Sequence, residues 1–292
     1  MTGEYGLLEP DESDAPGDEF EQIDVSDTEA DRIARERDRE FSEFRKRIKD
    51  SDRFKVDDGA FDDATFAALY KLVQDGYVDA IGGPLSTGKE ANVYNALAGE
   101  RSLEMLRAGE EEVAMKVYRT RATNFQDMRE YLVGDPRFEE LGDKKKIVMA
   151  WTRKELSNLE RARKAGVRVP RPITVERNVL IMEYIGTEDG RAKRLTEVTI
   201  ENPDTAFEVV REYIRRLYAA GLVHGDLSEY NVLFYDGELV VIDVGQAVTV
   251  HHPNAEEFLE RDCENVASFF RRQGMDVSGE ELLAWVYEHT DT

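Results

Sequence analysis

Apolar residues recur at three- and four-residue intervals in several parts of the chain, which is the pattern of helices that bury one face. The first well-defined helix starts at the capping candidates Asp62 and Asp63 and ends near Gly76. Helices with the same periodicity are predicted over 151–165, from about 205 to 221, over 255–272 and over 279–289.

Strands are predicted where apolar and β-branched residues form short runs between glycines and charged residues. Two runs, 91–98 and 113–119, are interpreted as strands of an antiparallel sheet. Two more runs cover 173–176 and 179–185. Further along, the runs 232–234 and 239–243 flank an Asp-Gly pair, which favours a tight hairpin turn.

Three segments lack the pattern of a buried element. Residues 1–31 carry twelve carboxylates and no lysine or arginine, so we interpret them as an acidic disordered tail. Residues 32–59 are highly charged and are interpreted as an exposed lead-in helix. Residues 121–146 are rich in charged and aromatic residues without a clear period and are interpreted as a flexible loop.

The chain has 292 residues, 41% of them hydrophobic, which suffices for a sizeable core. Its formal charge is −23, and about half of that excess lies in the acidic tail, so the folded part is only mildly acidic. An acidic surface disfavours non-specific binding to nucleic acid and fits a halophilic source. Cys263 is the only cysteine and no apolar run is long enough to cross a membrane, so we expect a cytoplasmic protein without membrane contact.

The most informative motif is HGDLSEYN at 224–231, with Asp243 after the predicted hairpin. It resembles the catalytic loop of protein kinases, H-x-D-L-x-x-x-N, followed by the aspartate of a metal-binding loop. In phosphoryl transfer one carboxylate orients the attacking hydroxyl or water, while an amide oxygen and a second carboxylate hold a metal ion on the phosphates. Asp226 is the candidate for the first role, and Asn231 and Asp243 are the candidates for the second. Each alone is compatible with a simple turn residue, but the combination favours catalysis.

A kinase also needs a lysine on a strand and a carboxylate on the next helix. Lys116 lies between apolar residues in the predicted strand 113–119, which directs its ammonium group towards phosphate oxygens. Glu155, in the first turns of the helix that begins near Trp151, is the preferred partner, and Glu160 on the same helix is the alternative. The partner's charge would fix the lysine before ATP binds.

The segment 83–89 reads GPLSTGK and satisfies the G-x-x-x-x-G-K pattern of a Walker A loop. Two features argue against that interpretation. Glu90 stands at the position where a Walker A loop has the Ser or Thr that binds magnesium. The residues that follow predict a strand and not the helix whose N-terminus would bind phosphate. As a turn between two strands, Ser86, Thr87 and Lys89 can still offer hydroxyls, N–H groups and one positive charge to phosphate oxygens.

Four segments together resemble the RIO family of atypical serine/threonine protein kinases. They are STGKEANVY at 86–94, AMKVY at 114–118, HGDLSEYN at 224–231 and IDVGQA at 242–247, and the similarity covers about residues 60–290. The type 1 branch is favoured because no winged-helix segment is recognisable before residue 60. The same branch is indicated by YL at 131–132, GDPRF at 134–138 and LERD at 259–262.

This resemblance implies an α+β, bilobal protein-kinase-like fold. Residues 60–183 would form N-terminal helices and a small antiparallel-sheet N-lobe, and residues 184–292 a reduced, mainly helical C-lobe. The resemblance also implies ATP with Mg²⁺ or Mn²⁺ as cofactors, autophosphorylation on serine or threonine, and a pre-ribosomal small subunit as partner in late maturation. By position, backbone groups of Glu183 and Ile185 would bind adenine. Asp243 would be transiently phosphorylated, which would make ATP hydrolysis the working activity.

The chain departs from ordinary kinases in two ways. Gly225 replaces the arginine that a phosphorylated activation loop binds, so that form of control is not available. Forty-nine residues follow Asp243, which is too few for ordinary peptide-binding helices. The loop in which the family carries an autophosphorylation site offers Thr123 but no serine, so the position of that site is left open. Basic clusters at 45–49 and 144–146 could meet ribosomal RNA, although a solvated face is the commoner explanation of such a cluster.

Two alternatives stay open on sequence alone. A small-molecule kinase of the aminoglycoside or choline type shares the His-x-Asp…Asn…Asp arrangement, but it needs a larger C-terminal substrate lobe. A nucleotide-gated, non-catalytic assembly factor is the other alternative, and the complete catalytic set argues against it. The sequence predicts neither the phospho-acceptor nor the oligomeric state.

Overall fold

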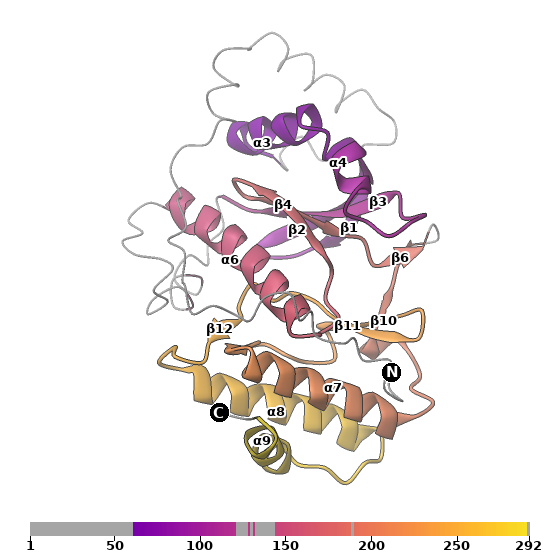
Figure 1. Cartoon of the computed structure of the whole chain (residues 1–292), viewed down its shortest axis with the longest axis vertical. Coiled ribbons are helices and arrows are strands. Elements are labelled where there is room, and N and C mark those ends of the chain that lie inside the picture. Colours follow the sequence, from indigo (N-terminus) through magenta and orange to yellow (C-terminus); the bar gives the residue numbers. More distant parts are fainter. Residues whose placement is uncertain (1–60, 121–127, 129–130, 132–143, 188–189, 291–292) are drawn as a thin grey trace.

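A five-stranded antiparallel sheet forms the centre of the N-terminal lobe (Figure 1). The computed structural model describes residues 61–120, 128, 131, 144–187 and 190–290. The strands follow the order β1-β2-β3-β5-β4 across the sheet. Their bounds are β1 Val78–Thr87, β2 Ala91–Ala98, β3 Glu112–Tyr118, β4 Pro172–Glu176 and β5 Val179–Glu183.

Helix α3 (Asp63–Gln74) packs on this sheet. Asp62 caps it by accepting a hydrogen bond from a backbone N–H of the first turn at 2.8 Å, as its place before the apolar pattern predicts. Leu69 of the helix is buried in one core cluster with Met115 and Ile181 of the sheet. The burial of this face explains why the apolar spacing alone was enough to predict the helix.

Helix α6 (Lys144–Lys164) runs diagonally from the sheet to the helices of the C-terminal lobe (Figure 1). Val148 and Trp151 are buried in a cluster with Tyr118 of β3. Towards its other end, Leu159 belongs to the core of the C-terminal lobe. A single helix therefore packs against the N-terminal sheet at one end and contributes to the core of the C-terminal lobe at the other.

The start of α6 differs from the predicted one. The apolar pattern places it near Trp151 and assigns 121–146 to a flexible loop, but Lys144–Lys146 already form the first turn of the helix. Ile147 and Val148 are buried, and their packing stabilises helix ahead of the clear apolar period. Three consecutive lysines hide this extension because they show no periodicity of their own.

Helices α7, α8 and α9 form the base of the C-terminal lobe (Figure 1). Their bounds are α7 Pro203–Ala219, α8 Ala255–Arg272 and α9 Gly279–Glu288, in close agreement with the apolar spacing. Asn202 caps α7, and Ser278 forms a capping box with Glu281 at the start of α9.

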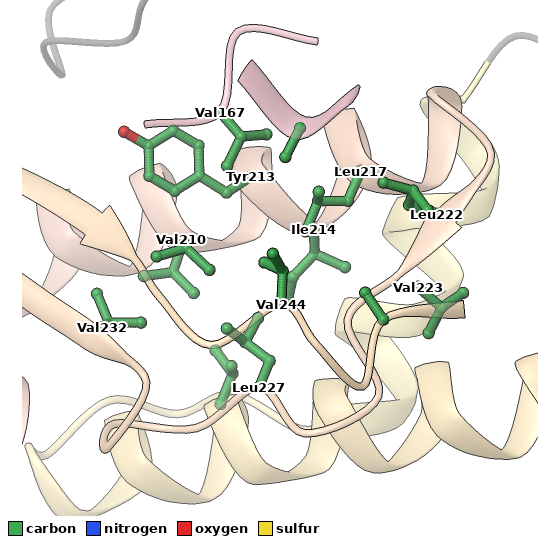
Figure 2. Close-up of a cluster of buried hydrophobic side chains, with 14 of the residues drawn as sticks. Val167, Val210, Tyr213, Ile214, Leu217, Leu222, Val223, Leu227, Val232 and Val244 are labelled. Atoms are coloured by element: carbon green, nitrogen blue, oxygen red, sulfur yellow. The ribbon is translucent and has the colours of Figure 1, made fainter. Parts of the chain in front are cut away.

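The core of this lobe also holds the two loops that carry predicted site residues. Figure 2 shows Val210 and Ile214 of α7 beside Leu227 and Val244, which come from loops. Both loop residues are at most 1% exposed. Each directly follows a predicted site residue, so burial of these two side chains positions the neighbouring carboxylates.

Short strands and turns lie between the larger elements. The hairpin of β10 (Val232–Tyr235) and β11 (Glu238–Val241) turns at Asp236 and Gly237, whose φ angles of 49° and 79° are those that an Asp-Gly turn predicts. At its base the N–H of Ile242 donates to the carbonyl of Asn231 at 2.9 Å, which brings both ends of the hairpin together. The remaining elements are α4 Glu100–Leu103, β6 Gly186–Thr187, β7 Gly190–Arg191, β8 Lys193–Arg194, η1 Leu195–Glu197, β9 Leu222–Val223, β10 Val232–Tyr235, β11 Glu238–Val241 and β12 Val248–Thr249.

Several predicted segments lie outside the described residues. They are the acidic tail 1–31, the lead-in helix 32–59, Thr123 and most of the loop 121–146. Among the described helices, none is both long and apolar enough to cross a membrane.

Candidate active site

A cleft of about 540 Å³ lies between the N-terminal sheet and the β10–β11 hairpin. Nearly all predicted site residues line it: Ser86, Thr87, Lys89, Lys116, Glu155, Glu183, Ile185, Asn231 and Asp243. Asp226 is not among the lining residues, but it contacts Asn231. The fold therefore gathers residues from both lobes around one cavity.

Lys116 connects the two lobes across this cleft. Its Nζ atom lies 2.6 Å from Oε1 of Glu155 and 2.8 Å from Oδ1 of Asp243. Lys116 and Glu155 are buried, whereas 56% of the Asp243 side chain is exposed. The preferred partner, Glu155, thus makes the ion pair, while the alternative Glu160 lies exposed on the same helix. Because α6 starts earlier than expected, Glu155 lies near the middle of the helix and not in its first turns.

The charges of these groups support one another. Burial disfavours the charged form of Lys116, but Asp243 and Glu155 outweigh it and raise the pKa of its ammonium group well above the ordinary value. In turn, the charge of Lys116 lowers the pKa of Asp243. Asp243 therefore presents a carboxylate, and not a neutral acid, to the cleft.

Tyr118 completes the surroundings of Glu155. Its hydroxyl donates a hydrogen bond to Oε2 of Glu155, and Nζ of Lys116 lies 5.1 Å from the centre of its ring. Burial and the nearby carboxylate raise the pKa of Tyr118 well above its ordinary value, so the hydroxyl keeps its proton. Both oxygens of Glu155 thus have a donor, and the lysine-glutamate pair is held from two sides.

Asp226 and Asn231 belong to the loop that precedes β10. Nδ2 of Asn231 donates to the backbone oxygen of Asp226 at 2.8 Å and to its Oδ2 atom at 3.3 Å. The amide oxygen of Asn231 is therefore directed away from Asp226. Burial raises the pKa of Asp226 above its ordinary value, and the negative charge of Asp243 acts in the same direction.

Asp262 of α8 holds the backbone of this loop. Its two carboxylate oxygens accept hydrogen bonds from the N–H groups of Gly225 and Leu227, both at 2.7 Å. Gly225 has a φ of 80°, a conformation that favours glycine. Burial raises the pKa of Asp262 to about 7, although the two hydrogen bonds oppose that shift. The sequence includes Asp262 in a family-like segment but does not reveal this role.

The turn between β1 and β2 has the geometry expected of a strand connection and not of a Walker A loop. The N–H of Gly88 donates to the carbonyl of Ala91 at 2.9 Å, and the next element is strand β2. A Cβ at Gly88 would lie 2.9 Å from that same carbonyl oxygen, so the close approach needs glycine. Ser86 and Thr87 end β1 and line the cleft beside Lys89.

The carboxylate of Glu183 has a structural partner behind the cleft. It accepts hydrogen bonds from Arg168 at 2.8 and 2.6 Å and from the N–H of Arg171 at 2.9 Å. Burial would raise the pKa of Glu183, but the hydrogen bonds and charge of Arg168 lower it. Arg168 also lies 3.3 Å from Glu238 of β11, so it links the end of β5 to the C-terminal lobe. The backbone of Glu183 and of Ile185 stays a predicted adenine contact.

The donors of the cleft suit a hard divalent cation bound together with a substrate. Within the part of the chain that the structure describes, no group of three or more His, Cys, Asp or Glu side chains is placed to hold a metal ion by itself. Asn231 and Asp243, which both line the cleft, supply an amide oxygen and a carboxylate. Mg²⁺ typically takes one or two such ligands and completes its shell with phosphate and water oxygens, so these residues fit it.

Comparison with known proteins places the chain in a family. Residues 92–282, well over half of the chain, match the sequence model of the RIO domain. The chain belongs to the RIO family. It is 65% identical to the RIO-type serine/threonine-protein kinase Rio1 of Haloferax volcanii, over 98% of this chain and 96% of that relative. It is 37% identical to the human serine/threonine-protein kinase RIO1, over 94% of this chain but 48% of that longer protein.

The fold of this RIO domain also has relatives among solved structures. The crystal structure of the Rio2 kinase-ADP/Mg²⁺-phosphoaspartate complex from Chaetomium thermophilum matches with a TM-score of 0.56 at 21% identity, over 76% of this chain and 66% of that one. The bilobal, kinase-like α+β fold is thereby confirmed. The resemblance to the type 1 branch is confirmed as well, and the Haloferax relative agrees with a halophilic archaeal source.

Arg194 is a charged cleft residue of this RIO domain that the sequence analysis did not single out. Arg194 lines the cleft and pairs with Leu233 of β10, so strand β8 joins the hairpin that carries the site. Its charge contributes to the lowered pKa of Asp243, after the larger effect of Lys116. A strand of two residues leaves no periodic signal, so the sequence shows only a polar stretch there.

Proposed function

We propose that this RIO domain binds ATP with Mg²⁺ or Mn²⁺ in the cleft and transfers the γ-phosphoryl group to a serine or threonine hydroxyl. The observation that carries the proposal is the contact of Lys116 with both Glu155 and Asp243, within 2.8 Å, at a cleft that Asn231 also lines. The names of the relatives, which are serine/threonine-protein kinases, support it.

Each residue has a chemical role in this proposal. Lys116, fixed by Glu155, binds phosphate oxygens, and Asn231 and Asp243 hold the divalent cation, which neutralises charge on the phosphates. The hydroxyl oxygen of the acceptor forms a bond to the γ-phosphorus, and the bond from that phosphorus to the β–γ bridging oxygen breaks, which leaves ADP. Asp226 orients the hydroxyl and accepts its proton.

ATP hydrolysis is the second candidate activity, favoured by the exposure of the Asp243 carboxylate in the cleft. Here an oxygen of Asp243 bonds to the γ-phosphorus and ADP leaves. Water then attacks the phosphorus, which releases phosphate and restores the carboxylate, with the proton of the water passing to solvent. The relative solved as an ADP/Mg²⁺-phosphoaspartate complex supports this candidate by analogy of fold only.

We further propose a pre-ribosomal small subunit in the cytoplasm as the partner, in late maturation. This part rests on the resemblance of the motifs to the RIO family. Lys145 and Lys146 at the start of α6 are exposed and offer positive charge to RNA on a chain that is otherwise acidic. Binding through such a local cluster is expected to weaken as salt rises.

One labelling experiment tests the activity. The full chain is incubated with γ-labelled ATP, Mg²⁺ and small-subunit precursors, and label is followed into free phosphate, this chain and other proteins. Hydroxylamine separates the two activities, because it cleaves an aspartyl phosphate and leaves phosphoserine and phosphothreonine intact. Label in serine or threonine supports the kinase, and hydroxylamine-sensitive label with free phosphate supports the hydrolase. If label is neither released nor transferred in a metal-dependent way, both activities are overturned.

A pair of variants on one helix provides the control. Glu155→Gln removes the charge that fixes Lys116, so transfer should fall by at least about tenfold. Glu160→Gln changes an exposed carboxylate of the same helix and should transfer as the unchanged chain does. Equal activity of the two variants would contradict the role of Glu155.

A further inference from the structure

Helix α6 makes a second set of contacts, with the loop that follows Asp243. Nζ of Lys154 donates a hydrogen bond to the backbone oxygen of Gly245 at 2.9 Å. Nδ2 of Asn158, one turn further along, donates to the backbone oxygens of Val244 and Ala247, both at 2.9 Å. Three carbonyl groups in four residues of the loop are thus bonded by one face of the helix that carries Glu155.

Both donors are completely buried, with no exposed surface. A buried ammonium group is costly unless the protein replaces its water, and the surroundings of Lys154 do so in part. Its Nζ atom lies 4.9 Å from the ring centre of Trp151 and 5.9 Å from that of Tyr131, in addition to the carbonyl of Gly245. The burial of this ammonium group indicates that its hydrogen bond to the carbonyl of Gly245 helps to hold the loop in place.

The loop itself is in close contact with α6 and β3. A Cβ at Gly245 would lie 3.0 Å from Nε1 of Trp151 and 3.1 Å from the hydroxyl of Tyr118, so only glycine fits there without displacing a side chain. Asp243 has a φ of 63°, which is uncommon for a residue other than glycine and strains its backbone. Such a conformation persists only when its surroundings hold it.

We propose that Lys154 and Asn158 are positioning residues that hold residues 243–247 against α6, so that Glu155 and Asp243 reach Lys116 as parts of one rigid unit. In this chain the metal-binding loop is then a fixed part of the site and not a switch. The proposal rests on the proposed function only in that Asp243 binds the metal ion. The attachment of the loop to the helix is a property of the protein without ligand.

Trp151 provides a reporter for this attachment, because it touches Gly245 and the chain has only two tryptophans. In a Trp285→Phe background, fluorescence comes from Trp151, and its quenching by acrylamide measures access to the loop contact. Lys154→Met and Asn158→Ala should each increase this quenching while the circular dichroism of the helices is retained. Arg163→Met, which changes an exposed cation on the same helix, is the matched control and should leave it unchanged.

Metal binding gives a second measurement. The affinity for Mn²⁺ in the presence of ADP, followed by its electron paramagnetic resonance, should fall by about 10- to 100-fold in both variants, as for other residues that orient a metal ligand. The affinity for ADP without metal should change little. Unchanged quenching together with unchanged Mn²⁺ affinity in folded Asn158→Ala would overturn the proposal. Should Lys154→Met fail to fold, Asn158→Ala alone is the deciding variant. Failure of the unchanged chain to bind ADP and Mn²⁺ would instead count against the proposed function, and the quenching would still test the attachment.

Discussion

The Nζ atom of Lys116 lies 2.8 Å from Oδ1 of Asp243, although 127 positions separate the two residues along the chain. This contact joins the N-terminal sheet to the loop after the C-terminal hairpin. Since Lys116 also bonds Glu155 of α6, one ammonium group connects three elements of the fold. The lysine that we propose to bind phosphate is therefore held in place by two carboxylates of the protein itself.

Replacement of this lysine should affect both activity and stability. Lys116→Met removes a positive charge at the phosphates, so transfer from ATP should fall by at least about 100-fold. It also leaves Glu155, which is 1% exposed, without its charged partner, and breaking such a buried pair costs about 3 kcal/mol. Denaturant unfolding and transfer assays measure the two effects. Lys164→Met, at an exposed position of α6, should change neither, and similar behaviour of the two variants would contradict the account.

Asp262 should make the stability of the protein depend on pH. Its pKa in the fold is about 7, above the ordinary value of 3.8, so between these values the folded protein binds a proton that the unfolded chain releases. The contribution of Asp262 to the free energy of unfolding therefore rises as pH falls from 8 towards 5. Asp262→Asn lacks this term, so the unchanged chain should gain stability relative to the variant over that range. Denaturant unfolding at pH 8 and pH 5 measures the difference, and a constant difference would show that Asp262 is ionised throughout.

Arg168 should contribute to stability through Glu183, which is 5% exposed. Arg168→Met leaves that carboxylate buried without its guanidinium partner, at a cost of about 3 kcal/mol. Because Arg168 lowers the pKa of Glu183 below its ordinary value of 4.5, the pair's contribution is complete above that pH and is lost as pH falls through the lowered pKa. Thermal unfolding at pH 7 and at pH 4 should show a larger loss at pH 7.

A double variant separates the ion pair from the volume of the side chains. Arg168→Met combined with Glu183→Met removes both charges and should recover part of the stability that the single change loses. If the double variant were as unstable as the sum of its two single changes, the pair would not be coupled.

Local patterns in the sequence were sufficient for most of the fold. Helix α8 has the predicted bounds because its apolar residues keep helical spacing from end to end, and the β10–β11 hairpin forms at the predicted Asp-Gly turn. Strand β1 was not among the predicted runs, although the segment that follows it was interpreted as a turn between two strands. Gly82, Gly83 and Pro84 interrupt its pattern, and its register with β2 shifts at several places, so it has no regular alternation to detect.

The site residues that belong to short motifs could be predicted from the sequence, whereas those whose role depends on burial in the fold could not. Lys116, Asn231 and Asp243 stand in short motifs of recognisable chemistry, and the structure brings them to one cleft. Lys154 and Asn158 stand on a charged helix and look like surface residues in sequence, yet their partners lie 91 and at least 86 positions away. Contacts between a side chain and a distant backbone carbonyl leave no local pattern in the sequence, so only the fold reveals them.

Asp226 offers the most direct test of the central claim that this cleft transfers the γ-phosphoryl group of ATP. The measurement is the rate of a single turnover with γ-labelled ATP and Mg²⁺, for the unchanged chain, for Asp226→Ala and for the exposed control Asp276→Ala, each at full occupancy checked by calorimetry. Asp226→Ala should bind nucleotide nearly as well as the unchanged chain but transfer at least about 100-fold more slowly, because the group that orients the acceptor and takes its proton is gone. Transfer by Asp226→Ala at the rate of the unchanged chain would contradict the account.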